Sequence, residues 1–355
     1  MLRRTLLLSG VVTAALAGVP PAASGADELP PTQLKVLVQD SPSPQTWALE
    51  LPFWEETVPQ ESDGRVTAVA APIDQLGVDD AAVLRLLKLG VFDFASFDIS
   101  KMAGDDPRFE GCDLAGLSLD IDTARRACDA WRPVIDRLMR ESWNAKLLAI
   151  GTAPPQVFWC RPEIAGLADL RGKKVRVFNK TMVDFLEGVG AEPVSINFRE
   201  VVPALQRGVV DCAVTGTLVG NTGGWTEVTQ YYFPMYLGWS INVHAANLDS
   251  WNGLDPAVQE FLTERFEGFE DKFWETMRAA MADADRCNFG KAPCEMGKVI
   301  ANMTLVPIRE DEEALRRDLI ENAVLRNWAA RAGAEAAEEW NGTVGEVLGM
   351  TAPVD

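Results

Sequence analysis

The chain has 355 residues, 47% of them hydrophobic, which is enough for about two domains with cores of their own. Its 52 acidic and 33 basic residues give a formal charge of −19 at pH 7, which disfavours nucleic acid or an anionic membrane surface as the main partner. The single histidine, His244, excludes a histidine-rich metal site and leaves a Ser-His-Asp triad one candidate base.

The N-terminus is typical of a secretory signal peptide. Arg3 and Arg4 precede an apolar run at residues 5–18, and small residues follow at 22–25, where cleavage is expected. The run is shorter than the ~20 residues of a membrane span, although a membrane anchor is the alternative. Removal of residues 1–25 takes away two arginines and no acid, so the mature charge becomes −21.

The hydrophobic pattern after residue 30 alternates between strands and helices, which predicts an α/β fold. In the first part, strands are expected at residues 34–39, 65–72, 91–97 and 146–151, and helices at 41–60 and 79–90. The breakers at 152–155 indicate a hinge between two lobes. Further strands are expected at 173–178, 209–215, 236–246 and 303–308, and helices at 181–189, 197–208, 255–286, 310–332 and 334–348.

One helix–glycine–strand unit occurs twice. Residues 87–95 and 205–213 share Leu, Gly, Val, Asp and Ala in register, and coincidence is the alternative. Taken at face value, the repeat indicates two similar lobes with a ligand cleft between them. The helix expected at 255–286 would be about 45 Å long, more than one lobe needs.

Export permits disulfides among the six cysteines, and no CxxC motif favours zinc. We expect Cys287 to pair with Cys294 across a Gly- and Pro-containing turn, and Cys112 to pair with Cys128 across a local loop. For Cys160 and Cys212, a bridge and two buried free thiols both remain open.

Two charged segments raise the question of ligand binding. The acids at residues 310–313 could bind a cation, but acidic residues are also favoured in the first turn of a helix. Within residues 169–177, strand alternation places Lys174 and Arg176 on one side and Val175 and Val177 toward the core. An arginine there can hold a carboxylate bidentately, and a solvated basic face is the alternative.

Residues 169–177, 190–194, 198–201 and 204–211 resemble, in order and spacing, the solute-binding subunits of TRAP (tripartite ATP-independent periplasmic) transporters, dicarboxylate-binding branch. The resemblance implies an α/β, two-lobe periplasmic binding protein (type II-like) with hinge strands and a long helix spanning both lobes. It also implies a small organic acid as ligand, delivery to a membrane permease, and neither catalysis nor a cofactor. The expected lobes are residues 26–152 with 239–290, and 153–238 with 291–355.

Carried over by position, Arg176 matches the family's carboxylate-binding arginine, Phe198 an aromatic pocket position, and Thr215 a position where many members have Asn. A second family arginine has no counterpart at residues 155–159. Its neighbourhood instead offers Gln156, Phe158 and Trp159, which indicate a less charged, more aromatic pocket.

Trp239 could stack on an apolar or aromatic ligand body, or it could be a core residue. Gln39, Ser41 and Asp98 follow strand ends of the first lobe and are weaker ligand-binding candidates, whereas His244 is expected to be structural. Two other functions remain open: a secreted hydrolase that uses two carboxylates, and a ligand sensor on the same fold.

Overall fold

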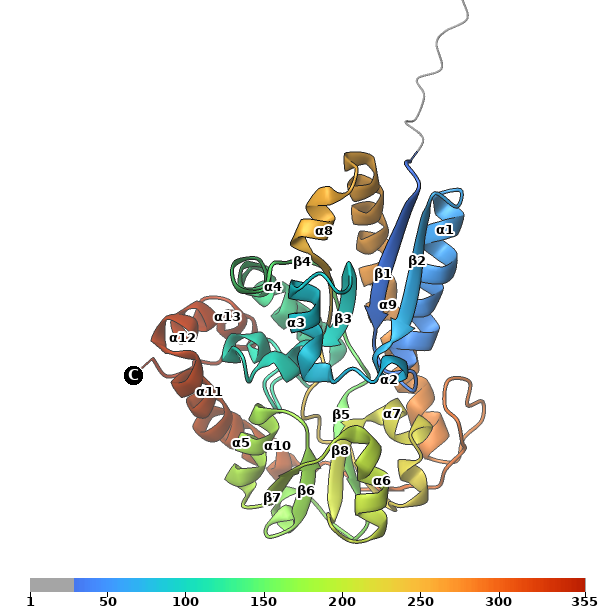
Figure 1. Cartoon of the computed structure of the whole chain (residues 1–355). Helices are drawn as coiled ribbons and strands as arrows, with labels where there is room; N and C mark the ends of the chain where they lie inside the picture. Colours follow the sequence, from blue (N-terminus) through green and yellow to red (C-terminus); the bar gives the residue numbers. More distant parts are fainter. Residues whose placement is uncertain (1–28, 355) are drawn as a thin grey trace, which may run out of the picture.

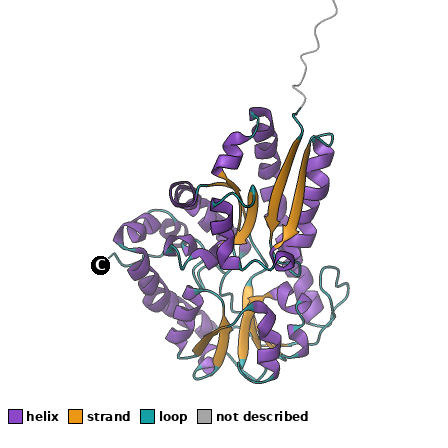
Figure 2. Cartoon of the chain, viewed as in Figure 1, coloured by secondary structure: helices purple, strands orange, loops and turns teal. Residues whose placement is uncertain are grey.

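The computed structural model describes residues 29–354, so the expected signal peptide lies outside the described residues. The described part is an α/β protein with two sheets, each covered by helices (Figures 1 and 2). This architecture confirms the two-lobe fold expected from the sequence. The precise lobe boundaries given above remain a prediction.

The first sheet has the strand order β2-β1-β3-β10-β4. β1 pairs in parallel with β2 and β3, whereas β10 is antiparallel to β3 and β4. A strand from late in the chain therefore completes this sheet. Its strands are β1 (Thr32–Val38), β2 (Val66–Pro72), β3 (Phe94–Asp98), β4 (Ala145–Gly151) and β10 (Asn242–Asn247).

The second sheet has the order β11-β9-β5-β8-β6-β7. β6 is parallel to β7 and β8, and β5 is antiparallel to β8 and β9. The strand expected at 303–308 is only two residues long. The strands of this sheet are β5 (Gln156–Cys160), β6 (Lys174–Val177), β7 (Glu192–Ser195), β8 (Cys212–Gly216), β9 (Tyr231–Phe233) and β11 (Thr304–Leu305).

The helices cover the sheets, and from Glu310 to Leu348 the chain is almost entirely helical. The α-helices are α1 (Val58–Glu61), α2 (Ile73–Leu76), α3 (Val83–Lys88), α4 (Ile121–Trp143), α5 (Lys180–Val189), α6 (Phe198–Gln206), α7 (Thr217–Thr222), α8 (Leu248–Gly253), α9 (Pro256–Asn288), α10 (Glu310–Leu319), α11 (Leu325–Ala332), α12 (Ala334–Asn341) and α13 (Val344–Leu348). Short π- and 3₁₀-helical segments are η1 (Thr46–Glu50), η2 (Phe53–Thr57), η3 (Asp80–Ala82), η4 (Ile99–Met102), η5 (Pro107–Glu110), η6 (Leu167–Leu170), η7 (Trp225–Glu227) and η8 (Ile320–Val324).

The repeated unit has the same local structure in both sheets. Gly90 and Gly208 both adopt left-handed backbone, with φ of 68° and 70°, where a side chain would be strained. The Asp93 carboxylate accepts a hydrogen bond from the backbone N–H of Lys35 (2.8 Å), and the Asp211 carboxylate accepts one from that of Lys174 (2.9 Å). Each aspartate thus ties its unit to the neighbouring strand, so the sequence repeat is a structural repeat.

Two chain segments cross between the sheets. Residues 152–155 connect β4 to β5, as the hinge prediction required, and residues 234–241 connect β9 to β10. They run side by side, because the backbone N–H of Ala153 donates to Trp239 O (2.9 Å) and that of Gln156 to Gly238 O (2.8 Å). The expectation of one continuous strand at 236–246 is wrong, since positive φ at Gly238 (145°) and Ser240 (44°) breaks the extended backbone before β10.

The long helix α9 joins the two halves of the molecule. Trp274 Nε1 donates to Ile150 O in β4 (2.8 Å), and Asn288 Nδ2 donates to Thr217 O in α7 (2.9 Å). β4 lies in the first sheet, whereas α7 follows β8 of the second. The helix therefore spans both lobes, as its predicted length indicated.

The C-terminal helices also contact both halves. Trp340 Nε1 donates to Gly111 O, and Trp328 Nε1 donates to Pro107 O, both in the segment after β3. On the other side, Arg331 forms an ion pair with Asp184 of α5 (2.7 Å). The C-terminal helices therefore connect the segment after β3 to helix α5.

All six cysteines are paired. The bridges are Cys112–Cys128, Cys160–Cys212 and Cys287–Cys294. The third pairing was left open by the sequence, and it follows from strand register, because Cys160 of β5 lies directly opposite Cys212 of β8. The loop expected between Cys112 and Cys128 is present only up to residue 120, because α4, a helix that the sequence analysis did not identify, begins at Ile121 and contains Cys128.

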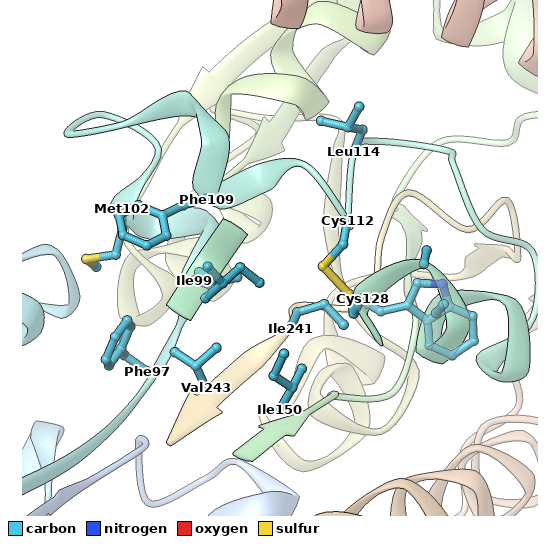
Figure 3. Close-up of a cluster of buried hydrophobic side chains, with 14 of the residues drawn as sticks. Phe97, Ile99, Met102, Phe109, Cys112, Leu114, Cys128, Ile150, Ile241 and Val243 are labelled. Carbon is cyan, nitrogen blue, oxygen red and sulfur yellow. A yellow bond between two sulfur atoms is a disulfide. The ribbon is translucent and has the colours of Figure 1, made fainter. Parts of the chain in front are cut away.

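The Cys112–Cys128 bridge borders a buried apolar cluster (Figure 3). Phe97 of β3, Ile150 of β4 and Val243 of β10 contribute to this core and are at most 1% exposed. The cluster therefore packs against β3, β4 and β10 close to where they join the crossing segments.

Candidate functional site

A cavity of about 90 Å³ lies where the two halves of the molecule meet. Residues that follow strands of both sheets line it, and the crossing segments contribute Ala153 and Ser240. The lining residues are Gln39, Asp40, Pro42, Ser43, Gln45, Asp98, Lys101, Ala153, Gln156, Arg176, Phe178, Phe198, Thr215, Val219, Ser240 and Asn242.

Arg176 enters this cavity from β6. Its side chain is fixed because Nε donates to Ile196 O (2.9 Å) and Nη1 donates to Val214 O (2.8 Å). The guanidinium also lies near the rings of Phe178 and Trp225, 5.3 and 5.8 Å from their centroids. Because two of its nitrogens are held by backbone carbonyls, the remaining nitrogen, Nη2, is oriented before any ligand arrives.

The Arg176 guanidinium is buried without a counter-charge in contact. Only 4% of the residue is exposed, and burial lowers its pKa to about 10. Within residues 29–354 the structure shows hydrogen bonds of this group to backbone carbonyls only, and no ion pair. A buried cation of this kind favours an anionic ligand, which would supply the missing partner.

Gln156, Thr215 and Phe198 lie around Arg176 in the cavity lining. Gln156 directly faces Gly216 across the β5–β8 pair, and its Nε2 donates to Pro154 O (3.2 Å). Phe198 begins α6 and stacks on Trp225, with ring centroids 5.8 Å apart. These residues and Arg176 are brought together as the sequence analysis expected.

The opposite wall comes from the first sheet. Asp98 ends β3, and Asn242 begins β10 directly opposite it in the antiparallel pair. Gln39 follows β1, and its backbone N–H donates to Glu50 Oε2 (3.0 Å). All three lining residues are at most 6% exposed, so this wall is polar yet largely removed from water.

The cavity lining contains both acidic and basic groups. Lys101 forms an ion pair with Asp80 (2.6 Å), and Asp40 lies 3.9 Å from Arg199. Burial, together with the nearby carboxylates of Asp80 and Asp74, raises the pKa of Asp40 to about 6. Burial also raises the pKa of Asp98, which Lys101 partly opposes. The lining thus offers charges of both signs to a ligand.

Four residues named from the sequence do not line the cavity. Trp239 is fully buried in the second crossing segment, and its Nε1 donates to Ser118 O (3.0 Å). Phe158 is fully buried and stacks on Phe233, while the Trp159 indole donates to Thr215 O (3.3 Å) from behind β8. The Ser41 hydroxyl donates to Asp74 (2.9 Å). Of the two alternatives for Trp239 the structure supports the core residue, and Phe158 also has a packing role instead of the pocket position expected from the sequence.

His244 is a buried residue of β10, as expected. Its Nε2 lies 3.6 Å from Glu50 Oε1, and neither atom has a hydrogen bond. Burial lowers the pKa of His244 to about 3 and raises that of Glu50 to about 7. Both side chains are therefore uncharged at mildly acidic pH, which argues against a structural ion pair.

The sequence analysis missed most of the wall opposite Arg176, namely Asp40, Gln45, Lys101 and Asn242. Asp40 and Lys101 follow predicted strands closely, so the end-of-strand position was a usable signal. Asn242 had no such signal, because the predicted strand covered residues 236–246 and Asn242 lay in its middle, not at its end.

Three other features bear on the class of the protein. Among residues 29–354, the one grouping of possible metal ligands is Asp283, Cys287 and Cys294, whose two sulfurs form a disulfide, so it does not fit a metal site. The acids at 310–313 occupy the first turn of α10, where Glu312 pairs with Arg309 (2.6 Å). No helix in the described part is both long and apolar enough to span a membrane.

Curated relatives share part of this chain. The protein YiiZ of Salmonella typhimurium is 25% identical over 206 residues, covering 57% of this chain and 62% of YiiZ. The sialic acid-binding periplasmic protein SiaP of Vibrio cholerae is 31% identical over 160 residues, covering 44% of this chain and 49% of SiaP. The matched regions thus span about half to three fifths of these relatives.

Solved structures share the fold over most of the chain. DctP7 of Bordetella pertussis, an extracytoplasmic solute receptor binding pyroglutamic acid, matches with a TM-score of 0.74 at 18% identity, covering 87% of this chain and 98% of DctP7. A TRAP periplasmic solute-binding protein of Desulfovibrio salexigens with bound orotic acid matches with a TM-score of 0.76 at 20% identity. The match covers 89% of this chain and 99% of that protein.

The family model for the bacterial extracellular solute-binding proteins, family 7 (DctP), matches residues 37–286. This region contains both sheets apart from β11 and residues 32–36 of β1, and it contains all the lining residues of the cavity. The resemblance to TRAP solute-binding subunits is confirmed, and the chain belongs to family 7 of the bacterial extracellular solute-binding proteins.

Proposed function

We propose that this protein is the periplasmic receptor of a TRAP transporter, which captures a small organic acid between its two lobes and delivers it to a membrane permease. The observation that carries this proposal is Arg176, a fixed and buried guanidinium without a counter-charge. A ligand carboxylate at Nη2 would complete its hydrogen bonds and neutralise its charge. The fold supports binding by lobe closure, with no covalent step.

The two crossing segments supply the movement. Residues 152–155 and 234–241 connect the sheets and are hydrogen-bonded to each other. Small backbone rotations there would separate Arg176 from the wall that contains Asp98 and Asn242. Closure then brings both walls onto the ligand and excludes water, which strengthens the contact between guanidinium and carboxylate.

The cavity lining changes the expected ligand. Phe178, Phe198 and Val219 offer apolar contact, but two aromatic residues expected in the pocket, Trp239 and Phe158, lie outside the cavity lining. The first-sheet wall is formed by Gln39, Gln45, Asp98 and Asn242. We therefore favour a small acid with a polar body.

A thermal-shift panel tests this function. Small monocarboxylates, each paired with its primary amide, are titrated into the mature protein. At least one acid should raise the melting temperature while its amide does not, because only the acid neutralises Arg176. An equal response to acid and amide in every pair would contradict carboxylate binding. Transport is separated from sensing by measuring uptake of the bound acid in cells that lack this protein.

A further inference from the structure

The wall opposite Arg176 contains two hydrogen-bond acceptors side by side. Asp98 and Asn242 face each other across the β3–β10 pair, and in an antiparallel sheet such partners project from the same face about 5 Å apart. Both side chains line the cavity. They are 6% and 1% exposed, so water has little access to them.

One acceptor atom of each side chain, Asp98 Oδ2 and Asn242 Oδ1, has no hydrogen-bond donor within the described residues. Asp98 Oδ1 accepts hydrogen bonds from the Ser100 backbone N–H (2.9 Å) and hydroxyl (2.7 Å), whereas the structure shows none for Oδ2. Asn242 Nδ2 donates to Ser240 O (2.8 Å). That bond fixes the amide orientation, and Oδ1 is left buried without a partner.

The rest of this wall adds one unpartnered acceptor and one unpartnered donor, so the excess of acceptors remains that of Asp98 and Asn242. Gln45 Oε1 is buried without a hydrogen bond, and Gln39 Nε2 is the corresponding unpartnered donor. Lys101, the cation on this side, has its ammonium engaged with Asp80 (2.6 Å). A buried acceptor without a donor costs free energy, so the closed cavity is complete only with a ligand that donates hydrogen bonds here.

An ammonium group meets these requirements. It donates several hydrogen bonds at once, and its positive charge can pair with the buried carboxylate of Asp98. Resting on the proposed function, we propose that the ligand is an amino carboxylate, with its carboxylate at Arg176 and its ammonium between Asp98 and Asn242. The ligand is then a zwitterion. Each of its two charges binds to a residue of a different lobe, so both charges are needed to hold the lobes closed.

The test uses matched ligand pairs and calorimetry on the mature protein after exhaustive dialysis. Each pair has one carbon skeleton with and without the ammonium: alanine and propanoate, 4-aminobutanoate and butanoate, 5-aminopentanoate and pentanoate. The length series samples different separations of the two charges. In at least one pair the amino acid should bind at least about tenfold more tightly than the plain acid.

The variant Asp98→Asn tests whether Asp98 causes the preference for the amino acid. Asparagine also caps helix starts well, so the variant keeps the cap that Asp98 provides for η4. It should weaken binding of the amino acid about tenfold or more, and it should not weaken binding of the plain acid. Asp79→Asn is the matched control, because Asp79 caps η3 in the same way but does not line the cavity. It should change neither affinity.

Two results would overturn the inference. One is a plain acid that binds as tightly as its amino partner in every pair, and the other is a preference for the amino acid that survives in Asp98→Asn. In either case the proposed function stands if acids still bind in preference to amides. If no acid and no amino acid binds, the proposed function fails together with the inference.

Discussion

Arg176 and Asp98 line one cavity from two different sheets, Arg176 near the end of β6 and Asp98 at the end of β3. The charged groups that would bind a ligand are therefore assembled only when the two halves of the molecule come together. The strongly negative charge of the protein does not oppose capture of an anion at this site. Exposed charges are screened over ~8 Å at physiological salt, whereas a buried guanidinium acts at contact.

Trp239→Phe should change stability and leave ligand affinity unaltered. The indole is fully buried, donates to Ser118 O, and does not line the cavity. Loss of that hydrogen bond and of packing volume should lower the free energy of unfolding by about 1–3 kcal/mol. Chemical denaturation measures the stability and calorimetry with a bound acid measures the affinity.

Phe198→Leu is the comparison for Trp239→Phe, because Phe198 does line the cavity. It should weaken binding more than Trp239→Phe does, while the half-buried position of its side chain keeps the loss of stability small. A large loss of affinity in Trp239→Phe with unchanged stability would restore the direct ligand role that the sequence suggested.

Glu50→Gln should make stability less dependent on pH. Burial raises the pKa of Glu50 from 4.5 to about 7. Between these values the folded protein holds a proton that the unfolded chain has lost, so the free energy of unfolding falls as the pH rises through this window. The fall in melting temperature from pH 5 to pH 8 should therefore be smaller in Glu50→Gln than in the unmodified protein.

The lowered pKa of His244 works in the opposite direction, because it adds stability as the pH rises from about 3 toward 6.5. Because His244 is retained in Glu50→Gln, its contribution acts in the same direction in both proteins. Glu55→Gln, a change at an exposed glutamate, should leave the pH profile unaltered. An identical profile for Glu50→Gln would show that Glu50 is already ionised at pH 5.

The Cys160–Cys212 bridge should stabilise the protein more than Cys287–Cys294. The two bridges close segments with sequence separations of 52 and 7 residues. Loop entropy predicts stabilisation of about 4 kcal/mol for the longer loop and about 2 kcal/mol for the shorter. Denaturation of the two double Cys→Ala variants measures the difference, and a greater loss for Cys287 and Cys294 would contradict the ranking.

Much of the fold could be predicted because strand and helix patterns are local. The repeat was visible since both copies need a left-handed glycine and an aspartate at the same positions, here Gly90 with Asp93 and Gly208 with Asp211. Helix α4 was missed, and it contains Pro133, a residue that normally indicates a break. The long strand at 236–246 failed because positive φ at Ser240 is not encoded in hydrophobic periodicity.

The site was predictable in detail on the Arg176 side, whereas on the opposite wall the sequence named only Gln39 and Asp98 among the lining residues. The motif around Arg176 identified the residue, but strand alternation grouped it with Lys174, which is exposed, whereas Arg176 is buried. The difference arises because Arg176 lies against the rings of Phe178 and Trp225 and donates to two backbone carbonyls. Asp98 and Asn242 come from strands that are distant in sequence and adjacent only through the β3–β10 pairing. Sequence order alone does not contain that pairing.

Calorimetry of Arg176→Ala with an acid found in the panel tests the central claim most directly. Arg171→Ala is the matched control, because Arg171 belongs to the same basic motif but is exposed and outside the cavity. Arg176→Ala should lose at least about a hundredfold in affinity, consistent with about 3 kcal/mol for a charge-assisted contact, while circular dichroism stays unchanged. Arg171→Ala should bind normally. Retained affinity in a folded Arg176→Ala protein would contradict the account.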